Sequence, residues 1–103
     1  MKRIIDGKIY DTETATLVAE ASASCSVSDF RHWEETLYRT PRGRWFVHGE
    51  GGPMSRWSRS IDQNSWSGGS GIIALSEAEA LEWCERNDID ADTVGEFFKL
   101  ETA

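Results

Sequence analysis

The stretch from Glu34 to Gly52 constrains the fold more than any other, because two β-prone runs flank a turn within it. Leu37-Tyr38 and Trp45-Phe46-Val47 are aliphatic and aromatic residues that pack well on a pleated sheet. The intervening Thr40-Pro41-Arg42-Gly43 fits a four-residue turn, since proline presets φ at the second position and glycine permits a positive φ near the end. We therefore predict an antiparallel hairpin that ends at the glycines Gly49, Gly51 and Gly52.

Neither strand of this hairpin alternates cleanly between apolar and polar residues. Side chains alternate across a strand, so Leu37 and Arg39 share one face and Tyr38 lies on the other. On the return strand, Phe46 lies on the face opposite to that of Trp45 and Val47. Apolar residues thus fall on both faces, and we expect both faces of the sheet to be partly covered. A core hairpin with no direct part in function is the simplest interpretation.

The N-terminal part of the chain predicts further strands. Asp6-Gly7 separates two short apolar runs between Ile4 and Tyr10, which is the preferred dipeptide of a type I′ hairpin turn. A turn over 11–15 precedes a strand over 16–21, for which a helix over 12–21 is the alternative. Residues 22–28 are small and polar and predict a loop, after which a strand begins near Phe30.

Between Gly49 and Gly71 the composition changes to glycine, serine, asparagine and proline, with Trp57 and Trp66 among them. This predicts a long loop, or a short element held by its aromatic residues, and loops of this length are often functional. We expect Ser67–Gly71 to be flexible. It is not a phosphate-binding loop, because the lysine and the spacing are missing.

The C-terminal part predicts a strand over 71–75 followed by helices. Ser76 and Glu79 form the capping box that starts a helix, and Asp90 starts a second, shorter helix. We therefore predict a single α+β domain over 1–103, an antiparallel sheet of about four to six strands with one or two C-terminal helices on one face. The apolar residues expected to face the sheet are Ala80, Leu81, Trp83, Cys84, Val94, Phe97 and Phe98.

The formal net charge of −7 lies in the last quarter of the chain. Residues 1–76 contain nine basic and nine acidic residues, whereas residues 77–103 contain nine acidic and two basic residues. This asymmetry predicts a surface that repels nucleic acid and attracts basic protein surfaces, although an acidic helix can also serve solubility alone. The candidate partner-binding residues there are Glu79, Glu82, Glu85, Asp88, Asp90 and Asp92.

Five tryptophans are many for 103 residues, so some are expected to be exposed. Trp57 and Trp66 are candidate anchors for a partner. Arginines interleave with Trp45 and Trp57, which is the chemistry of phosphate contact and base stacking. The overall acidity argues against nucleic acid as a partner. The candidate residues for binding nucleic acid are Arg39, Arg42, Arg44, Arg56 and Arg59. The alternative is that these arginines form surface pairs with Glu34, Glu35 and Glu50.

No motif for catalysis, a metal or a cofactor stands out. Cys25, His32, His48 and Cys84 match no compact zinc spacing, and the acidic residues form no facing pair that a glycosidase would need. Nothing like a signal peptide follows Met1, and no apolar run approaches membrane-spanning length. We expect a cytoplasmic, non-enzymatic protein without cofactor, whose two cysteines are free thiols.

Three stretches resemble a group of small proteins encoded on prophages and other mobile elements. They are Lys2–Ala15, Glu35–Gly52 and Leu75–Trp83, together 41 of the 103 residues. Small acidic proteins of this type are similar to anti-CRISPR proteins, which bind Cas components stoichiometrically. The resemblance implies an inhibitor of a bacterial defence system, acting in the host cytoplasm on a Cas protein with a basic surface. The alternative is an accessory module that binds nucleic acid through the Arg/Trp hairpin and loop.

Overall fold

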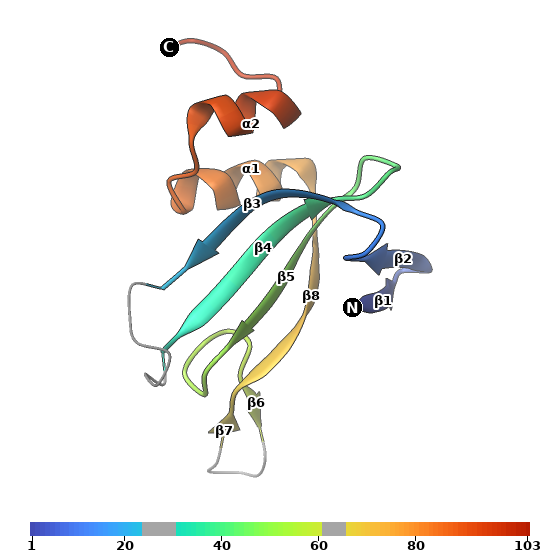
Figure 1. Ribbon diagram of the computed structural model, residues 1–103, viewed down its shortest axis with the longest axis vertical. Helices are drawn as coiled ribbons and strands as arrows, with labels where there is room; N and C mark the ends of the chain where they lie inside the picture. Colours follow the sequence, from blue (N-terminus) through green and yellow to red (C-terminus); the bar gives the residue numbers. More distant parts are fainter. Residues whose placement is uncertain (24–30, 61–65) are drawn as a thin grey trace.

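The computed structural model describes residues 1–23, 31–60 and 66–103. These residues form a four-stranded antiparallel sheet, two separate two-stranded ribbons and two C-terminal helices (Figure 1). Most of the predicted loop over 22–28, and the predicted strand start near Phe30, lie outside the described residues. The elements in chain order are β1 (Lys2–Ile5), β2 (Lys8–Asp11), β3 (Thr16–Ser22), β4 (Trp33–Arg39), β5 (Trp45–Gly51), β6 (Arg59–Ser60), β7 (Trp66–Ser67), β8 (Gly69–Leu75), α1 (Glu77–Arg86) and α2 (Ala91–Phe97).

The main sheet has the order β3-β4-β5-β8, and every neighbouring pair is antiparallel. Its centre is the predicted hairpin, in which Leu37 pairs with Val47 and Gly43 takes a φ of +82° in the turn. Both helices pack on one face of this sheet. Ala80, Trp83 and Cys84 of α1 join Leu37 and Val47 in the larger buried core. The α+β class, with C-terminal helices on one face of an antiparallel sheet, is therefore confirmed.

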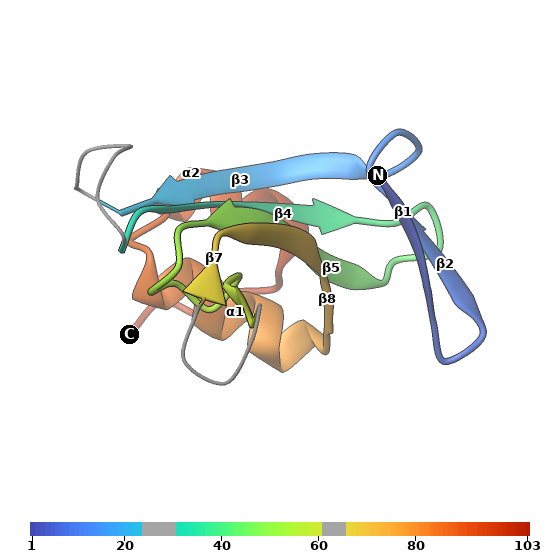
Figure 2. The same ribbon diagram turned by 90° about the horizontal axis from the view of Figure 1, so that it is seen from below.

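The opposite face of the sheet is partly covered by the β1–β2 ribbon. Asp6 and Gly7 both have positive φ, as the predicted type I′ turn requires. Tyr10 of β2 meets Phe46 of β5 edge to face at 5.6 Å, and the two form a second core with Ile72. In Figure 2 the ribbon projects from the sheet on the side away from α2 and the C-terminus. This explains why three consecutive residues, Trp45 to Val47, are all buried.

β5 ends at Gly51, within the predicted glycine stretch, and Gly49 is still part of the strand. The indole of Trp57 lies directly over Gly49, where a Cβ would come within 2.2 Å of the ring. Gly49 pairs with Gly71 of β8, where an added Cβ would lie 3.6 Å from the same ring. The glycines therefore create space for a tryptophan from the following turn. The predicted flexible stretch Ser67–Gly71 belongs mainly to β7 and β8.

The start of α1 is the predicted capping box. The Ser76 hydroxyl accepts from the Glu79 backbone, and the Glu79 carboxylate accepts from the Ser76 backbone. Asp90 likewise caps α2 by accepting from the Thr93 backbone. No helix in the described ranges is long and apolar enough to cross a membrane.

Candidate functional site

The carboxylate of Glu35 is buried in the layer between the sheet and α1. Glu35 is 7% exposed and lies in β4 opposite Gly49 of β5. Trp33, Glu35 and Leu37 alternate along β4, so they share the face that the helices cover. A carboxylate at such a position requires hydrogen-bond donors, because burying an unpaired charge costs several kcal/mol.

Three side chains supply these donors. Arg56 approaches in a two-pronged geometry, with Nε 2.6 Å from Oε2 and Nη2 2.7 Å from Oε1. The indole Nε1 of Trp57 donates to Oε2 at 2.9 Å, and that of Trp83 donates to Oε1 at 2.8 Å. Each carboxylate oxygen thus accepts two hydrogen bonds. We call these four residues the Glu35 cluster.

The pKa of Glu35 lies below its ordinary value of 4.5 despite burial. Burial raises it, but the hydrogen bonds from Arg56, Trp83 and Trp57 and the positive charge of Arg56 outweigh that effect. Glu35 is therefore ionised at neutral pH. A strongly ionised, fully hydrogen-bonded carboxylate is a poor general base or acid, so the arrangement is that of a structural tie.

The Glu35 cluster joins three parts of the chain that are distant in sequence. Glu35 belongs to β4, Arg56 and Trp57 to the turn after β5, and Trp83 to α1. The turn is closed locally by Ser55, whose hydroxyl donates to the Gly52 carbonyl and accepts from the Trp57 backbone. The cluster consequently fixes the position of α1, and with it the side chains that α1 presents to solvent.

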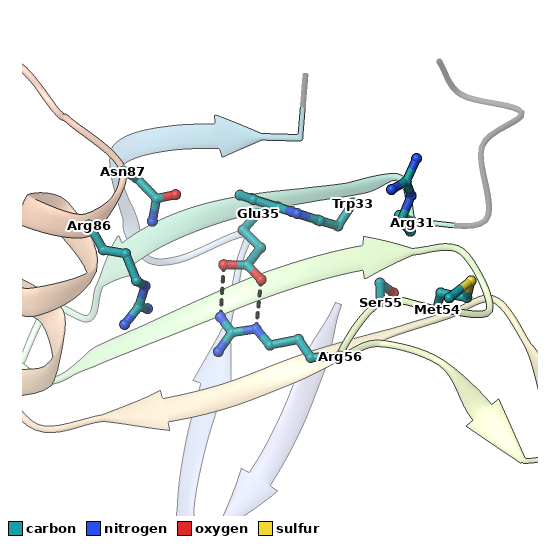
Figure 3. Close-up of a pocket in the computed structure, with 8 residues that line it drawn as sticks. All are labelled: Arg31, Trp33, Glu35, Met54, Ser55, Arg56, Arg86 and Asn87. Carbon is teal, nitrogen blue, oxygen red and sulfur yellow. Dashed lines mark hydrogen bonds and ion pairs between the residues drawn. The ribbon is translucent and has the colours of Figure 1, made fainter. Parts of the chain in front are cut away.

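A cavity of about 750 Å³ opens beside the cluster, between β4, the turn over 53–56 and the end of α1 (Figure 3). Figure 3 shows the Glu35–Arg56 pair in its middle, with Arg86 and Asn87 of the α1 end on one side and Met54 on the other. We call it the arginine cavity. Its lining residues are Arg31, Trp33, Glu35, Met54, Ser55, Arg56, Arg86 and Asn87.

The predicted acidic residues form a surface on the two helices. Glu79, Glu82 and Glu85 lie on the exposed side of α1, and Asp92 lies on α2. Asp88, with a φ of +58°, and Asp90 lie in the connection between the helices. Each of the predicted acidic residues is exposed. We call this the acidic helix surface, formed by Glu77, Glu79, Glu82, Glu85, Asp88, Asp90, Asp92 and Glu96.

The expectation that Trp57 is exposed is wrong. Its side chain is 7% exposed, packs on Gly49 and donates to Glu35. The glycine-rich composition around it suggested a surface loop. Instead, the missing side chains at Gly49 of β5 and Gly71 of β8 provide the space in which the ring is buried. Trp66 pairs with Ser60 in the β6–β7 ladder. Its side chain lies outside the described part of the structure, so its role as an anchor stays a prediction.

The predicted nucleic-acid-binding arginines do not form one stripe. Arg56 is committed to the Glu35 cluster, and Arg39 is partly buried with its guanidinium 5.5 Å from the Trp45 ring. Arg59 lies in β6, away from the hairpin turn. Arg42 and Arg44 remain exposed at the β4–β5 turn. The alternative expectation that arginines pair with Glu35 is correct for Arg56.

The Glu35 cluster itself was not predicted as a unit. A signal was present, since Glu35 alternates with Leu37 on a strand and Trp83 lies on the apolar face of a helix. A buried indole N–H normally finds an acceptor, and a carboxylate on a core-facing position is a suitable one. Nothing local in the sequence shows that the turn after β5 folds back over the same position.

The described residues contain no group of three or more histidine, cysteine or acidic side chains placed to hold a metal ion. Cys84 is buried in the core, where burial and the nearby Glu85 carboxylate raise the pKa of its thiol. It is therefore a packed residue and not an activated nucleophile. Cys25 lies outside the described residues.

Comparisons with protein-family models, with curated proteins and with solved structures each gave no match. Proposals about function therefore depend on the acidic helix surface, the exposed arginines and the arginine cavity.

Proposed function

We propose that this protein is a non-enzymatic inhibitor that places its acidic helix surface against the basic, nucleic-acid-binding surface of a partner protein. The observation that supports this most is the exposure of eight carboxylates on α1, α2 and the connection between them. Only Arg86 and Lys99 are basic in residues 77–103, and Arg86 lines the arginine cavity. Carboxylates at this density compete with phosphates for a basic surface and speed the encounter with it.

The rigidity of this surface supports the same proposal. The α1 helix is fixed by its capping box at one end and by the bond from Trp83 to Glu35 in its middle. A preorganised surface loses less entropy on binding than a mobile one. The resemblance to anti-CRISPR proteins suggests the partner class, a Cas effector whose guide- or target-binding surface is basic.

Charge reversal tests this proposal. Glu82→Lys, Glu85→Lys and Asp92→Lys combined should weaken binding to a purified Cas effector by at least about a hundredfold and abolish inhibition in a plasmid-interference assay. Glu13→Lys, Glu20→Lys and Glu50→Lys reverse three exposed carboxylates outside the helices and serve as the matched control. Binding should also weaken as salt rises.

Affinity purification from a bacterial host, followed by mass spectrometry, would identify the effector to test. If the protein bound none of the Cas effectors tested and left interference intact in cells, the proposal would be wrong. Equal losses in the helix variant and the control variant would also contradict it, because they would point to overall charge and not to the helices.

A second candidate function is nucleic-acid binding at the two hairpin turns. Lys8, Arg42 and Arg44 line a groove of about 490 Å³ between the β1–β2 turn and the β4–β5 turn, and none of the described residues that line it is acidic. Gel shifts at low salt should then weaken on Arg42→Ala and Arg44→Ala but not on Arg59→Ala. Absence of a shift at any salt concentration would eliminate this candidate.

A further inference from the structure

Among the described residues, no acidic side chain forms an ion pair with Arg86, which lines the arginine cavity. The charge of Arg56 is paired with Glu35, whose two oxygens already accept four hydrogen bonds. Arg86 ends α1 one turn after Glu82, a spacing that favours an ion pair along the helix. Among the described residues, however, its guanidinium makes no ion pair, and it lines the cavity instead (Figure 3).

This placement is notable in a chain of net charge −7. Eight exposed carboxylates lie on α1, α2 and the connection between them, yet the cavity is lined by both Arg56 and Arg86 and, among its described lining residues, by a single carboxylate, Glu35, that is already fully hydrogen-bonded. The negative end of the α1 dipole favours a cation at this position, which accounts for a basic residue there. It does not require the guanidinium to line the same cavity as a second, already paired guanidinium. Two such groups on one cavity favour an anion between them.

The other walls of the cavity match the rest of a small ligand. Trp33 is partly buried and offers an aromatic surface, and Met54 is 68% exposed at the rim. A volume of about 750 Å³ is in the range of small-molecule sites. Guanidinium groups bind phosphate through paired N–H donors, and indole rings stack on nucleobases.

We propose that the arginine cavity binds a nucleoside monophosphate, with its phosphate at Arg86 and the outer edge of Arg56 and its base against Trp33. This site is separate from the acidic helix surface and does not depend on the proposed function. The same chemistry is offered by a free nucleotide and by the 5′-terminal nucleotide of a single strand. Only a terminal or free phosphate carries the second negative charge that two guanidinium groups can use.

Calorimetric titration of the intact protein at low salt tests the site with AMP, adenosine, inorganic phosphate and a 5′-phosphorylated oligoadenylate. AMP should bind, adenosine should bind at least about tenfold more weakly, and phosphate should compete with AMP. Arg86→Gln should weaken AMP binding by about tenfold or more, whereas Arg86→Lys should retain part of it. Arg59→Gln, at an exposed arginine outside the cavity, is the matched control.

Trp33→Leu should weaken AMP binding without changing competition by inorganic phosphate, which separates stacking from charge. Tighter binding of AMP than of the oligonucleotide identifies a free nucleotide as the ligand, and the reverse order identifies a strand end. Circular dichroism and thermal unfolding of each variant establish that it is folded. Absence of AMP binding at millimolar concentration, or equal losses for Arg86→Gln and Arg59→Gln, would overturn the proposal.

Discussion

At the scale of single residues, Glu35 is the position on which the fold depends most. Glu35→Ala leaves two buried indole N–H groups and the Arg56 guanidinium without their acceptor. Removing one partner of a buried ion pair costs about 3–5 kcal/mol. We therefore expect the free energy of unfolding, measured in urea, to fall by that amount. Glu34→Ala, at the exposed neighbour on the other face of β4, should change stability by less than about 0.5 kcal/mol. Equal losses of stability in the two variants would contradict the structural role of the Glu35 cluster.

The same residue sets a pH dependence. The pKa of Glu35 is lowered in the folded protein from its ordinary value of 4.5, so the folded state binds this proton less readily than the unfolded state. Its contribution to stability is therefore complete above about pH 4.5 and is lost as pH falls below that value, through the lowered pKa of the folded state. Glu35→Gln should be less stable than the native protein at pH 7, and the difference should shrink towards pH 3.

Subtracting the Glu35→Gln profile removes the contributions of other groups with shifted pKa values, such as Glu79 and His48. The measurement is the free energy of unfolding in urea at each pH. A constant difference between pH 7 and pH 3 would show that the ionisation of Glu35 does not stabilise the fold.

At the scale of elements, the sequence predicts those features that local chemistry determines. The Asp6-Gly7 turn and the Ser76–Glu79 capping box require only a few neighbouring residues, and both form as expected. Trp57 shows where such reasoning fails, because its environment is built by the cross-strand glycines Gly49 and Gly71. Glycine after a strand predicts a stop locally. At Gly49 the strand continues, and the missing side chain leaves room for the Trp57 ring.

This contact gives a prediction for β5. A Cβ on Gly49 would lie 2.2 Å from the Trp57 ring, so Gly49→Ala must displace the ring and strain its bond to Glu35. Overpacking of this kind typically costs about 1–3 kcal/mol. Gly71→Ala is the matched control, because its Cβ would meet the same ring at an ordinary 3.6 Å. Thermal unfolding and near-ultraviolet circular dichroism should show a loss of stability and an altered tryptophan signal for Gly49→Ala but not for Gly71→Ala. The same result for both variants would contradict the packing of Trp57 on Gly49.

At the scale of the whole molecule, the charge asymmetry of the sequence corresponds to one acidic region of the surface, since the acidic residues of 77–103 lie exposed on the two helices and the segments next to them. Surface position could be predicted because periodicity separates the apolar face of a helix from its charged face. The arginine cavity could not, because β4, the turn after β5 and the end of α1 meet only in the folded chain. The position of Arg86 becomes significant only when the structure shows that Glu35 already accepts four hydrogen bonds.

An acidic surface of this kind should reduce the stability of the free protein. Like charges three or four residues apart on a helix repel, as Glu82 does with Glu85 and Glu79. Raising sodium chloride from about 10 mM to about 0.5 M should therefore increase the free energy of unfolding by about 1 kcal/mol, as repulsion is screened.

Neutralising four of these residues separates the helices from the rest of the molecule. A variant with Glu82→Gln, Glu85→Gln, Asp92→Asn and Glu96→Gln should lose more than half of the increase, whereas changing Glu13, Glu20, Glu34 and Glu50 to Gln should not. The measurement is urea unfolding at each salt concentration. If the helix variant kept the full increase, the carboxylates would not repel one another. A surface that lowers the stability of the free protein is explained better by a basic partner than by solubility alone, because a partner's cations relieve the same repulsion.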